Sequence, residues 1–216
     1  MSLSLHFHPL SSYCWKVLIG LYENDIAFEP VIINLGDPAS REPFIALWPL
    51  GKMPVLRDEA RNETVPESTI ILDYLDLYHP GRVRFTPADP EAARRVRLWD
   101  RTFDLHVHAH MQKIVGDRLR PDGGRDPVGV SQARSQLDVA YGLIERGLEG
   151  RTWLSEDQFG LAECAAFPAL YYGDKVHPVG PDRPMTAAYL ARLSQRPSVA
   201  RVLSEAEPFF QYFPQA

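Results

Sequence analysis

The first 78 residues combine short apolar runs with segments in which apolar positions recur at helical spacing. Leu3–Phe7 alternates apolar and polar side chains before Pro9, which predicts a short strand. In residues 12–23 the apolar positions recur every three or four residues, which predicts a helix that begins at Ser11 or Ser12. The same patterns predict further strands at 28–33, 55–57 and 64–65 and further helices at 41–47 and 67–78.

This order of elements predicts a single mixed sheet. A βαβ unit contributes two parallel strands, and the following ββα unit adds a hairpin, so about 80 residues should form a four-stranded sheet with helices packed on it. The N-terminal part is therefore predicted to be an α/β domain.

The pattern changes after residue 78. The stretch HPGRVRFTPADP, residues 79–90, contains three prolines and one glycine, which is typical of a linker. Helical spacing then continues to the aromatic tail FFQYF at 209–213. We therefore predict an α/β domain at 1–79, a linker at 80–89 and an all-helical domain at 90–216, with helices at 91–119, 131–148, 161–173, 185–195 and 198–206.

Composition narrows the class of protein. The chain has 216 residues, 45% of them hydrophobic, and a formal charge of −5, so its overall charge gives no reason to expect nucleic acid or an anionic membrane as a partner. Two cysteines are too few for a disulfide framework, and the first ten residues do not have the pattern of a signal peptide. We expect a cytoplasmic globular protein without a membrane span.

Candidate chemistry is concentrated in HPLSSYCWKV, residues 8–17. Ser11, Ser12, Tyr13 and Cys14 follow one another at the predicted start of a helix, where unpaired N–H groups and the helix dipole stabilise an anion such as a thiolate. The register of Cys14 with Val17 and its apolar neighbours predicts a buried structural thiol. The two serines are thus the better candidates for the site.

A second helix start lies in VPESTIILDYL, residues 65–75. Glu67 and Ser68 fall in its first turn, where they would either help to bind an anionic ligand or cap their own helix. Pro54 in LGKMPVL stands just before a predicted strand, and the X–Pro bond is expected to be trans by default. Neither stretch identifies a function by itself.

Together, HPLSSYCWKV, FIALWPLGKMPVL and VPESTIILDYL resemble the cytosolic glutathione S-transferase superfamily. The motifs lie within residues 6–78, and GLAECAAFPALYY and RPSVARVL give weaker support further along. The resemblance is to serine-type, bacterial members with some zeta-class character. It implies a thioredoxin-like N-terminal domain with a four-stranded mixed sheet, an all-helical C-terminal domain, glutathione as co-substrate, no metal, a role in detoxification and a homodimer.

The resemblance also assigns roles to residues. It implies that the hydroxyl of Ser11 contacts the glutathione sulfur, with Ser12 as the alternative, and that Met53 precedes a cis Pro54 and pairs with the cysteinyl part of glutathione. Further glutathione contacts carried over from the family are Lys52, Glu67 and Ser68.

Two departures from the family pattern are informative. Ser12 stands where proline is usual, which resembles the SSCSW stretch of the zeta class. Gly160 and Glu163 replace the Ser or Thr and the Asp of the usual capping box, and since glycine has no side-chain acceptor, we expect a less rigid start to the helix at 161–173.

The helix predicted at 91–119 supplies the candidates for the second substrate. The resemblance places this helix beside the active site, which makes Phe103, His106 and His110 candidates for the electrophile pocket. His106 and His110 are one turn apart and could share a metal ion, but no third ligand is evident.

The function implied is conjugation of the glutathione thiolate to a small hydrophobic electrophile. Two alternatives stay open at this stage: a glutathione-dependent isomerase of the zeta (maleylacetoacetate isomerase) type, and a non-catalytic glutathione-binding protein.

Overall fold

The computed structural model describes residues 2–121, 123–156 and 158–214. Its first part follows the predicted order of strands and helices. The elements are β1 Leu3–Phe7, α1 Ser12–Glu23, β2 Glu29–Ile32, α2 Pro38–Leu47, β3 Val55–Asp58, β4 Glu63–Pro66 and α3 Ser68–Tyr78.

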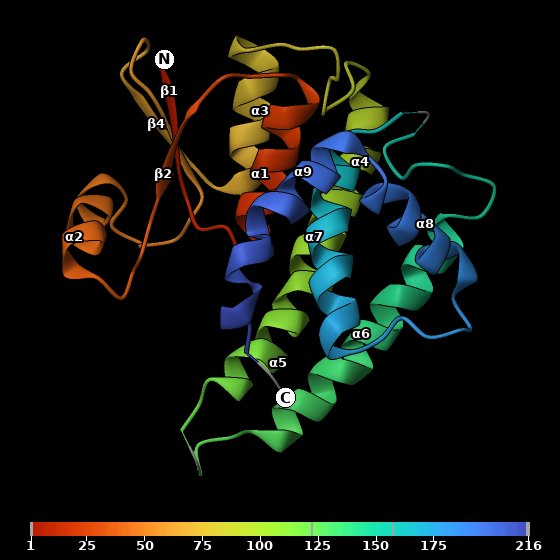
Figure 1. Ribbon diagram of the computed structural model, residues 1–216. Coiled ribbons are helices and arrows are strands. Elements are labelled where there is room, and N and C mark those ends of the chain that lie inside the picture. Colours follow the sequence, from red (N-terminus) through yellow and green to blue (C-terminus); the bar gives the residue numbers. More distant parts are fainter. Residues whose placement is uncertain (1, 122, 157, 215–216) are drawn as a thin grey trace.

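The four strands form one mixed sheet in the order β2-β1-β3-β4. β1 runs parallel to β2 and antiparallel to β3, and β3 and β4 form the hairpin, so that Leu5 lies opposite Pro30 on one side and Leu56 on the other. Leu3, Leu5 and Phe7 belong to one buried cluster with residues of α1 and α3, whereas Phe44 of α2 packs in a second cluster with Ile33 and Val55. Figure 1 shows α2 on the other side of the sheet from α1 and α3. This arrangement confirms the predicted mixed sheet of a thioredoxin-like domain.

The second part of the described chain is all helical, which confirms the predicted fold class. It contains α4 Pro90–Thr102, α5 Ala109–Arg118, α6 Pro127–Gly147, α7 Leu161–Val176, α8 Pro184–Ser194 and α9 Pro197–Ala206, and the tail forms a 3₁₀ turn at Glu207–Tyr212. A π-helical segment, Phe103–His108, joins α4 to α5 where the sequence predicts one regular helix. Among the described residues, no helix is long and apolar enough to cross a membrane.

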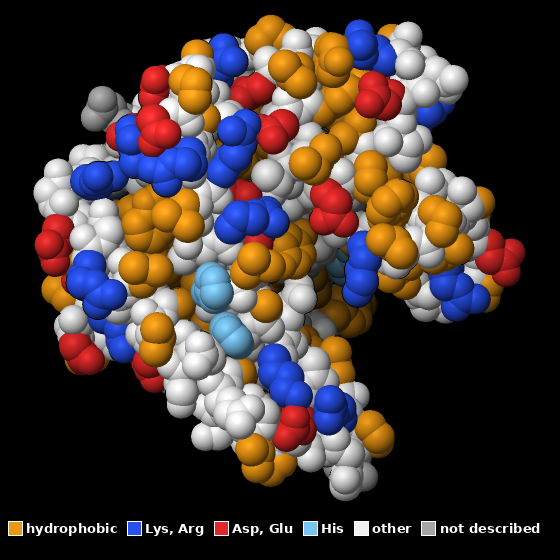
Figure 2. Space-filling model, turned by 180° about the vertical axis from the view of Figure 1, so that it is seen from behind, with side chains coloured by type: hydrophobic (Ala, Val, Ile, Leu, Met, Phe, Trp, Pro, Cys, Tyr) orange, Lys and Arg blue, Asp and Glu red, His pale blue; other side chains and the backbone are white. Residues whose placement is uncertain are grey.

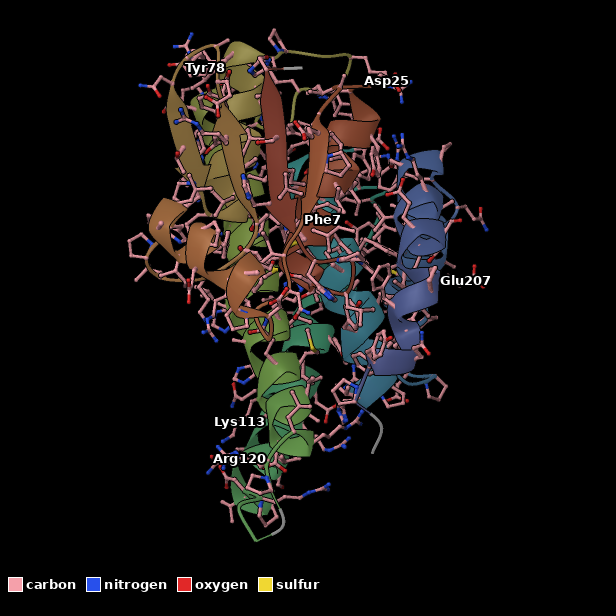
Figure 3. The ribbon with its side chains drawn as sticks, turned by 60° about the vertical axis from the view of Figure 1, so that its left-hand side comes forward. Phe7, Asp25, Tyr78, Lys113, Arg120 and Glu207 are labelled. Carbon is pink, nitrogen blue, oxygen red and sulfur yellow. The ribbon has the colours of Figure 1, made fainter. Side chains whose placement is uncertain are left out.

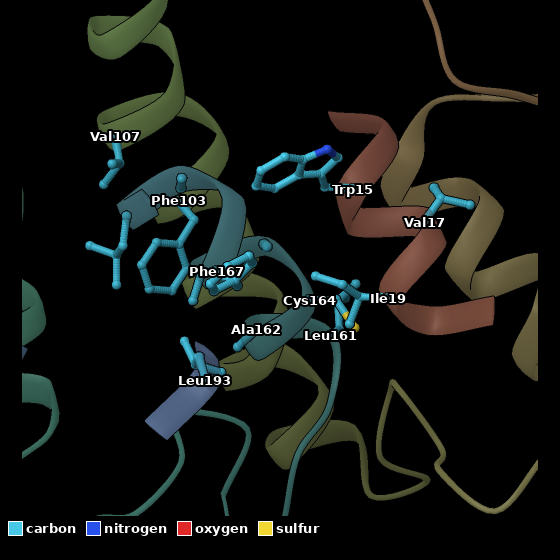
Figure 4. Close-up of a cluster of buried hydrophobic side chains, with 14 of the residues drawn as sticks. Trp15, Val17, Ile19, Phe103, Val107, Leu161, Ala162, Cys164, Phe167 and Leu193 are labelled. Atoms are coloured by element: carbon cyan, nitrogen blue, oxygen red, sulfur yellow. The ribbon is translucent and has the colours of Figure 1, made fainter. Parts of the chain in front are cut away.

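The two parts share one hydrophobic core. Trp15 of α1 is fully buried and stacks on Phe167 of α7, with ring centroids 6.0 Å apart (Figure 4). Tyr172 packs at 4.8 Å from the same indole, and the indole N–H donates to the carbonyl of Pro9 at 2.5 Å. The buried cluster therefore continues from the sheet through α1 into the helical bundle.

An ion pair fastens the end of α1 to the junction of α8 and α9. Glu23 is almost completely buried and accepts two hydrogen bonds from Arg196, at 2.9 and 2.6 Å, and one from the hydroxyl of Ser198. Burial alone would raise the pKa of Glu23, but these donors outweigh it and hold the pKa below its ordinary value.

The start of α7 is held more firmly than the sequence predicts. The carboxylate of Glu163 accepts from the backbone N–H groups of Leu154 at 2.6 Å and Gly160 at 2.9 Å. The hydroxyl of Ser155 accepts from the N–H of Ala162 at 3.0 Å, and a Cβ on Gly160 would come within 2.9 Å of that hydroxyl. Ser155 thus occupies the space of the missing side chain and supplies its acceptor, so the prediction of a less rigid start is wrong.

Candidate active site

A cavity of about 1150 Å³ lies between the sheet domain and the helices that follow it. Figure 3 shows Phe7 at the end of β1, where the sheet meets the helices, and loop 8–11 continues from there into α1. One wall comes from this loop and from residues 33–36, 51–54 and 67–70, and the other from α4, the π-helical segment and α5. Figure 2 shows the surface hollowed between the lobe that carries α2 and the helical body.

Ser11 is the N-cap of α1 and lines this cavity. Its Oγ accepts the N–H of Cys14 at 3.4 Å, and its own N–H donates to the carbonyl of His8 at 2.9 Å. The hydroxyl also lies close enough to the Cys14 thiol to favour its thiolate form, and a hydroxyl can accept one hydrogen bond while donating another. Ser12, the other predicted candidate, is buried in the first turn and does not line the cavity.

Cys14 lies one turn inside α1 and is completely buried, as its register predicts. Burial raises the pKa of the thiol to about 12, although the nearby Ser11 hydroxyl favours the thiolate. A neutral, buried thiol is a poor nucleophile. Cys14 is therefore a packing residue.

The segment before β3 brings a backbone edge to the cavity. The Met53–Pro54 peptide bond is cis, and Lys52, Met53 and Pro54 all line the cavity. Among the described residues, no backbone group pairs with the N–H of Met53. Lys52 is exposed beside it and extends this wall with a positive charge.

Glu67 and Ser68 line the cavity at the start of α3. Glu67 is the N-cap residue with φ of 70°, a left-handed conformation, and its side chain makes no capping hydrogen bond. The carboxylate is thus free of its own helix, which removes the simple capping interpretation for Glu67. Ser68 is buried in the first turn, where N–H groups of α3 face the cavity.

A buried lysine fixes the helical wall of the cavity. The Nζ of Lys16 lies 2.5 Å from Asp100 and 2.9 Å from Asp104, and it donates to the hydroxyl of Thr69 at 2.8 Å. Arg101 forms ion pairs with the same two carboxylates from the solvent side, with its guanidinium 2.8 Å from Asp100 and 2.5 Å from Asp104. Burial would raise the pKa of Asp104, but the charges and hydrogen bonds of Lys16 and His108 together outweigh it and lower the pKa.

This cluster is not predicted from the sequence. Its only local signal in the sequence is a lysine inside the apolar run CWKVLIGL. The structure buries every residue from Cys14 to Leu21, that lysine included. The partners of Lys16 lie more than 50 positions away in the sequence. The cluster joins α1, α3 and the π-helical segment, and so positions Ser68 and Tyr13 relative to one another.

The predicted electrophile residues lie elsewhere. Phe103 is completely buried in the core, His106 is exposed, and His110 is half-buried, and none of the three lines the cavity. Asp104, Leu105 and Gln112 line it instead. A π-helical turn contains more residues than an α-helical one, so the side chains after Thr102 are shifted around the axis relative to the pattern that the sequence predicts.

Tyr13 closes the inner end of this wall. Its hydroxyl donates to the carbonyl of Asp104 at 3.3 Å, and its ring packs on that of His108 with centroids 4.5 Å apart.

Among the described residues, no three His, Cys, Asp or Glu side chains are grouped so as to hold a metal ion.

Two family models match the chain. The model of the glutathione S-transferase N-terminal domain matches residues 5–83, and that of the C-terminal domain matches residues 106–197.

Individual relatives agree with these matches. Glutathione S-transferase GstB of Escherichia coli is 26% identical over 190 residues, which cover 87% of this chain and 91% of GstB. FtsZ-localized protein A of Caulobacter vibrioides is 29% identical over 217 residues, which cover 95% of this chain and 92% of that protein. A crystal structure of a glutathione S-transferase from Methylobacillus flagellatus with GSH bound has a TM-score of 0.84 at 27% identity, covering 93% of this chain and 98% of that one.

Proposed function

Because this chain belongs to the cytosolic glutathione S-transferase superfamily, we propose that it binds glutathione in the cavity and transfers its thiolate to an electrophile. The observation that carries this proposal is the position of Ser11. Ser11 lines the cavity at the N-cap of α1, where its hydroxyl can donate to a sulfur bound in the cavity.

The free energies are adequate for this role. A free thiol has a pKa of roughly 8.5, and lowering it by two units takes roughly 2.7 kcal/mol. A hydrogen bond to a charged acceptor contributes about 1.5–3 kcal/mol, and a helix N-terminus adds up to about 1–2 kcal/mol. Ser11 and the first turn of α1 can therefore keep the sulfur of glutathione ionised at neutral pH, with the serine acting as a donor and not as a base.

The remaining contacts follow the family resemblance. We propose that the backbone of Met53 pairs with the cysteinyl amide of glutathione, that Glu67 and Ser68 hold its γ-glutamyl end, and that Lys52 contacts its glycyl carboxylate. Within the described part of the chain, the N–H of Met53 has no backbone partner and the carboxylate of Glu67 makes no capping hydrogen bond, which supports this orientation. The electrophile would then lie against Leu10 and the residues of the opposite wall, Tyr13, Leu105 and Gln112.

The test is a titration of the thiolate absorbance of bound glutathione in wild type and in the Ser11→Ala, Ser12→Ala and Cys14→Ala variants, together with turnover on a chloronitroaromatic. We expect Ser11→Ala to raise the pKa of bound glutathione and to lower turnover about ten- to a hundredfold, with little change in glutathione affinity. Ser12→Ala and Cys14→Ala should resemble wild type.

Unchanged turnover in Ser11→Ala would sink the assignment of that residue. A loss of turnover in Ser12→Ala instead would assign the contact with the glutathione sulfur to Ser12. Glutathione binding without thiolate absorbance or conjugation would identify a non-catalytic binding protein. Faster isomerisation of maleylacetoacetate than conjugation would identify the zeta-type isomerase.

We also propose a homodimer formed through α3 and α4. Leu77 is 69% exposed and Leu98 is 59% exposed on these helices, and Ile70 and Tyr78 are also exposed on α3. Sedimentation of wild type should give a dimer and Leu77→Glu a monomer, whereas Leu119→Glu, equally exposed at the end of α5, should remain dimeric. A monomeric wild type would contradict this proposal.

A further inference from the structure

A second cavity, of about 500 Å³, lies on the other side of the loop between β1 and α1. It is bounded by the last turns of α1, by the segment between α1 and β2 together with β2 itself, and by α9 with the 3₁₀ turn that follows it. Phe7 and Pro9 line this second cavity, whereas His8 and Leu10 line the active-site cavity. Among the described residues, none lines both, so the loop separates two distinct spaces.

The walls of the second cavity are largely apolar. Leu18, Leu21 and Val202 line it and belong to the buried core. Phe28 and Phe209 add half-buried aromatic rings. A concave space of this volume with such walls is of the kind that binds small molecules.

The edge strand beside the cavity is unsuited to pairing with a peptide. β2 is at the edge of the sheet, and the N–H of Ile33 donates to the carbonyl of Phe7 at 2.8 Å. Because successive N–H groups of a strand point to opposite sides, the backbone nitrogens of Pro30 and Ile32 face outward. Proline has no N–H, so one of the two outward donors of β2 is missing. We therefore expect a small molecule in this cavity and not an added strand.

Three charged side chains line the second cavity, Asp25, Arg201 and Glu205. Nε of Arg201 donates to Glu205 at 2.8 Å, and its guanidinium lies 3.9 Å from the centre of the Tyr22 ring. The Tyr22 hydroxyl donates to the other carboxylate oxygen of Glu205 at 2.5 Å. The positive charge of Arg201 is thus paired with a carboxylate and covered on one face by an aromatic ring.

Asp25 carries the remaining charge. It is exposed in the turn after α1, on the same side of the molecule as α9 (Figure 3), and no Lys, Arg or His of the described residues forms an ion pair with it. The hydrogen bond to Glu205 raises the pKa of Arg201, and the charge of Asp25 adds to this effect. The lining residues therefore have two negative charges against one positive charge, and this excess favours a cation.

We propose that the second cavity binds a small hydrophobic amine, whose apolar body lies against Phe28 and Phe209 and whose ammonium group pairs with Asp25. This inference goes beyond the function proposed above, which places glutathione and the electrophile in the active-site cavity. Because the two cavities have different linings, the amine and glutathione should bind at the same time.

Two probes with the same aromatic ring and opposite charge test the ligand class. 1-Naphthylmethylamine is a cation at pH 7, and 1-naphthylacetate is an anion. Isothermal titration calorimetry of the full chain should give a dissociation constant on the order of 100 µM for the amine and at least tenfold weaker binding of the acetate. Saturating S-hexylglutathione should leave the affinity for the amine unchanged.

Two variants locate the bound amine. Asp25→Asn keeps a residue that tolerates the left-handed φ of 50° and removes the charge, so it should weaken binding of the amine about three- to tenfold. Ala27 lines the second cavity with an exposed side chain, and Ala27→Trp should fill the space and abolish binding. Ala60→Trp, at an exposed position between β3 and β4, is the matched control and should bind as wild type.

Several results would overturn the inference. Displacement of the amine by S-hexylglutathione would place it in the active-site cavity, and unchanged affinity in Ala27→Trp would place it elsewhere on the surface. Tighter binding of 1-naphthylacetate than of the amine would show that Arg201, and not Asp25, determines the ligand class. Absence of binding by both probes would show that the second cavity is not a ligand site.

Discussion

At the scale of single residues, the reactive-looking side chains of the first loop differ sharply in what surrounds them. Ser11 faces the cavity, whereas Cys14, three residues later, is enclosed by the core. Cys164 on α7 is equally buried, and burial raises its pKa well above the ordinary value. The sequence contains two thiols, and both are surrounded by apolar packing.

We therefore expect neither cysteine to react rapidly with a thiol reagent in the folded protein, because a buried neutral thiol is neither accessible nor ionised. Ellman's reagent should label almost nothing in native buffer and two thiols per chain in denaturant. Rapid labelling of one thiol in native buffer would contradict the burial, and Cys14→Ala and Cys164→Ala would identify which one reacted.

The sequence predicted some residues of the candidate site and missed others, for a physical reason. The placements at Ser11, Pro54 and Glu67 could be predicted because a helix start and a motif are local features. Lys16 could not, because its partners are remote in the sequence. Phe103 was predicted from the family resemblance and is buried in the core, whereas Leu105 lines the cavity and lies in a π-helical turn that regular α-helical spacing does not reveal.

At the scale of elements, most helices and strands could be predicted from periodicity, since most of them present an apolar face to one of the two buried clusters. β1 and α1 have the predicted bounds, whereas α2 begins at Pro38, three residues before the predicted start. Its first turn depends on Asp37, whose side chain caps the N–H of Ala39. Caps of this kind contribute no apolar periodicity and are easily missed.

At the start of α7, the hydroxyl of Ser155 supplies the acceptor that Gly160 lacks, and this can be tested. Ser155→Ala removes the acceptor of the buried N–H of Ala162, so we expect the free energy of unfolding to fall by about 1–2 kcal/mol. Urea unfolding measures the change, and Ser135→Ala, at an exposed position on α6, should have almost no effect.

Restoring the usual cap extends this test. Gly160→Ser alone should also destabilise the protein, because its side chain would meet the Ser155 side chain at 2.9 Å. In the double variant Ser155→Gly with Gly160→Ser, the loss should be smaller than the sum of the single losses. Simple additivity would show that Ser155 does not substitute for the missing side chain.

At the scale of the whole molecule, the ion pair of Glu23 and Arg196 makes stability depend on pH. The pKa of Glu23 is lowered on folding, so its contribution is present above the unfolded value of roughly 4.3 and is lost as the pH falls through the folded pKa. Glu23→Gln should cost about 3 kcal/mol at pH 7, and the difference from wild type should shrink below about pH 4.

Urea unfolding over this pH range measures the effect. Glu91→Gln breaks an exposed pair with Arg94 and should change stability by less than about 1 kcal/mol. A penalty for Glu23→Gln that does not vary with pH would show that packing, and not the charge of Glu23, accounts for the loss.

The aromatic packing around Trp15 also limits how this protein can be recombined with its relatives. An exchange of the helical half would remove Phe167 and Tyr172, which cover the indole, and would leave a large apolar side chain of α1 facing water or a void. A viable chimera must therefore exchange Trp15 together with its aromatic neighbours on α7. A chimera joined within the linker would take Trp15 from one parent and its aromatic neighbours on α7 from the other, and so would break this set of contacts.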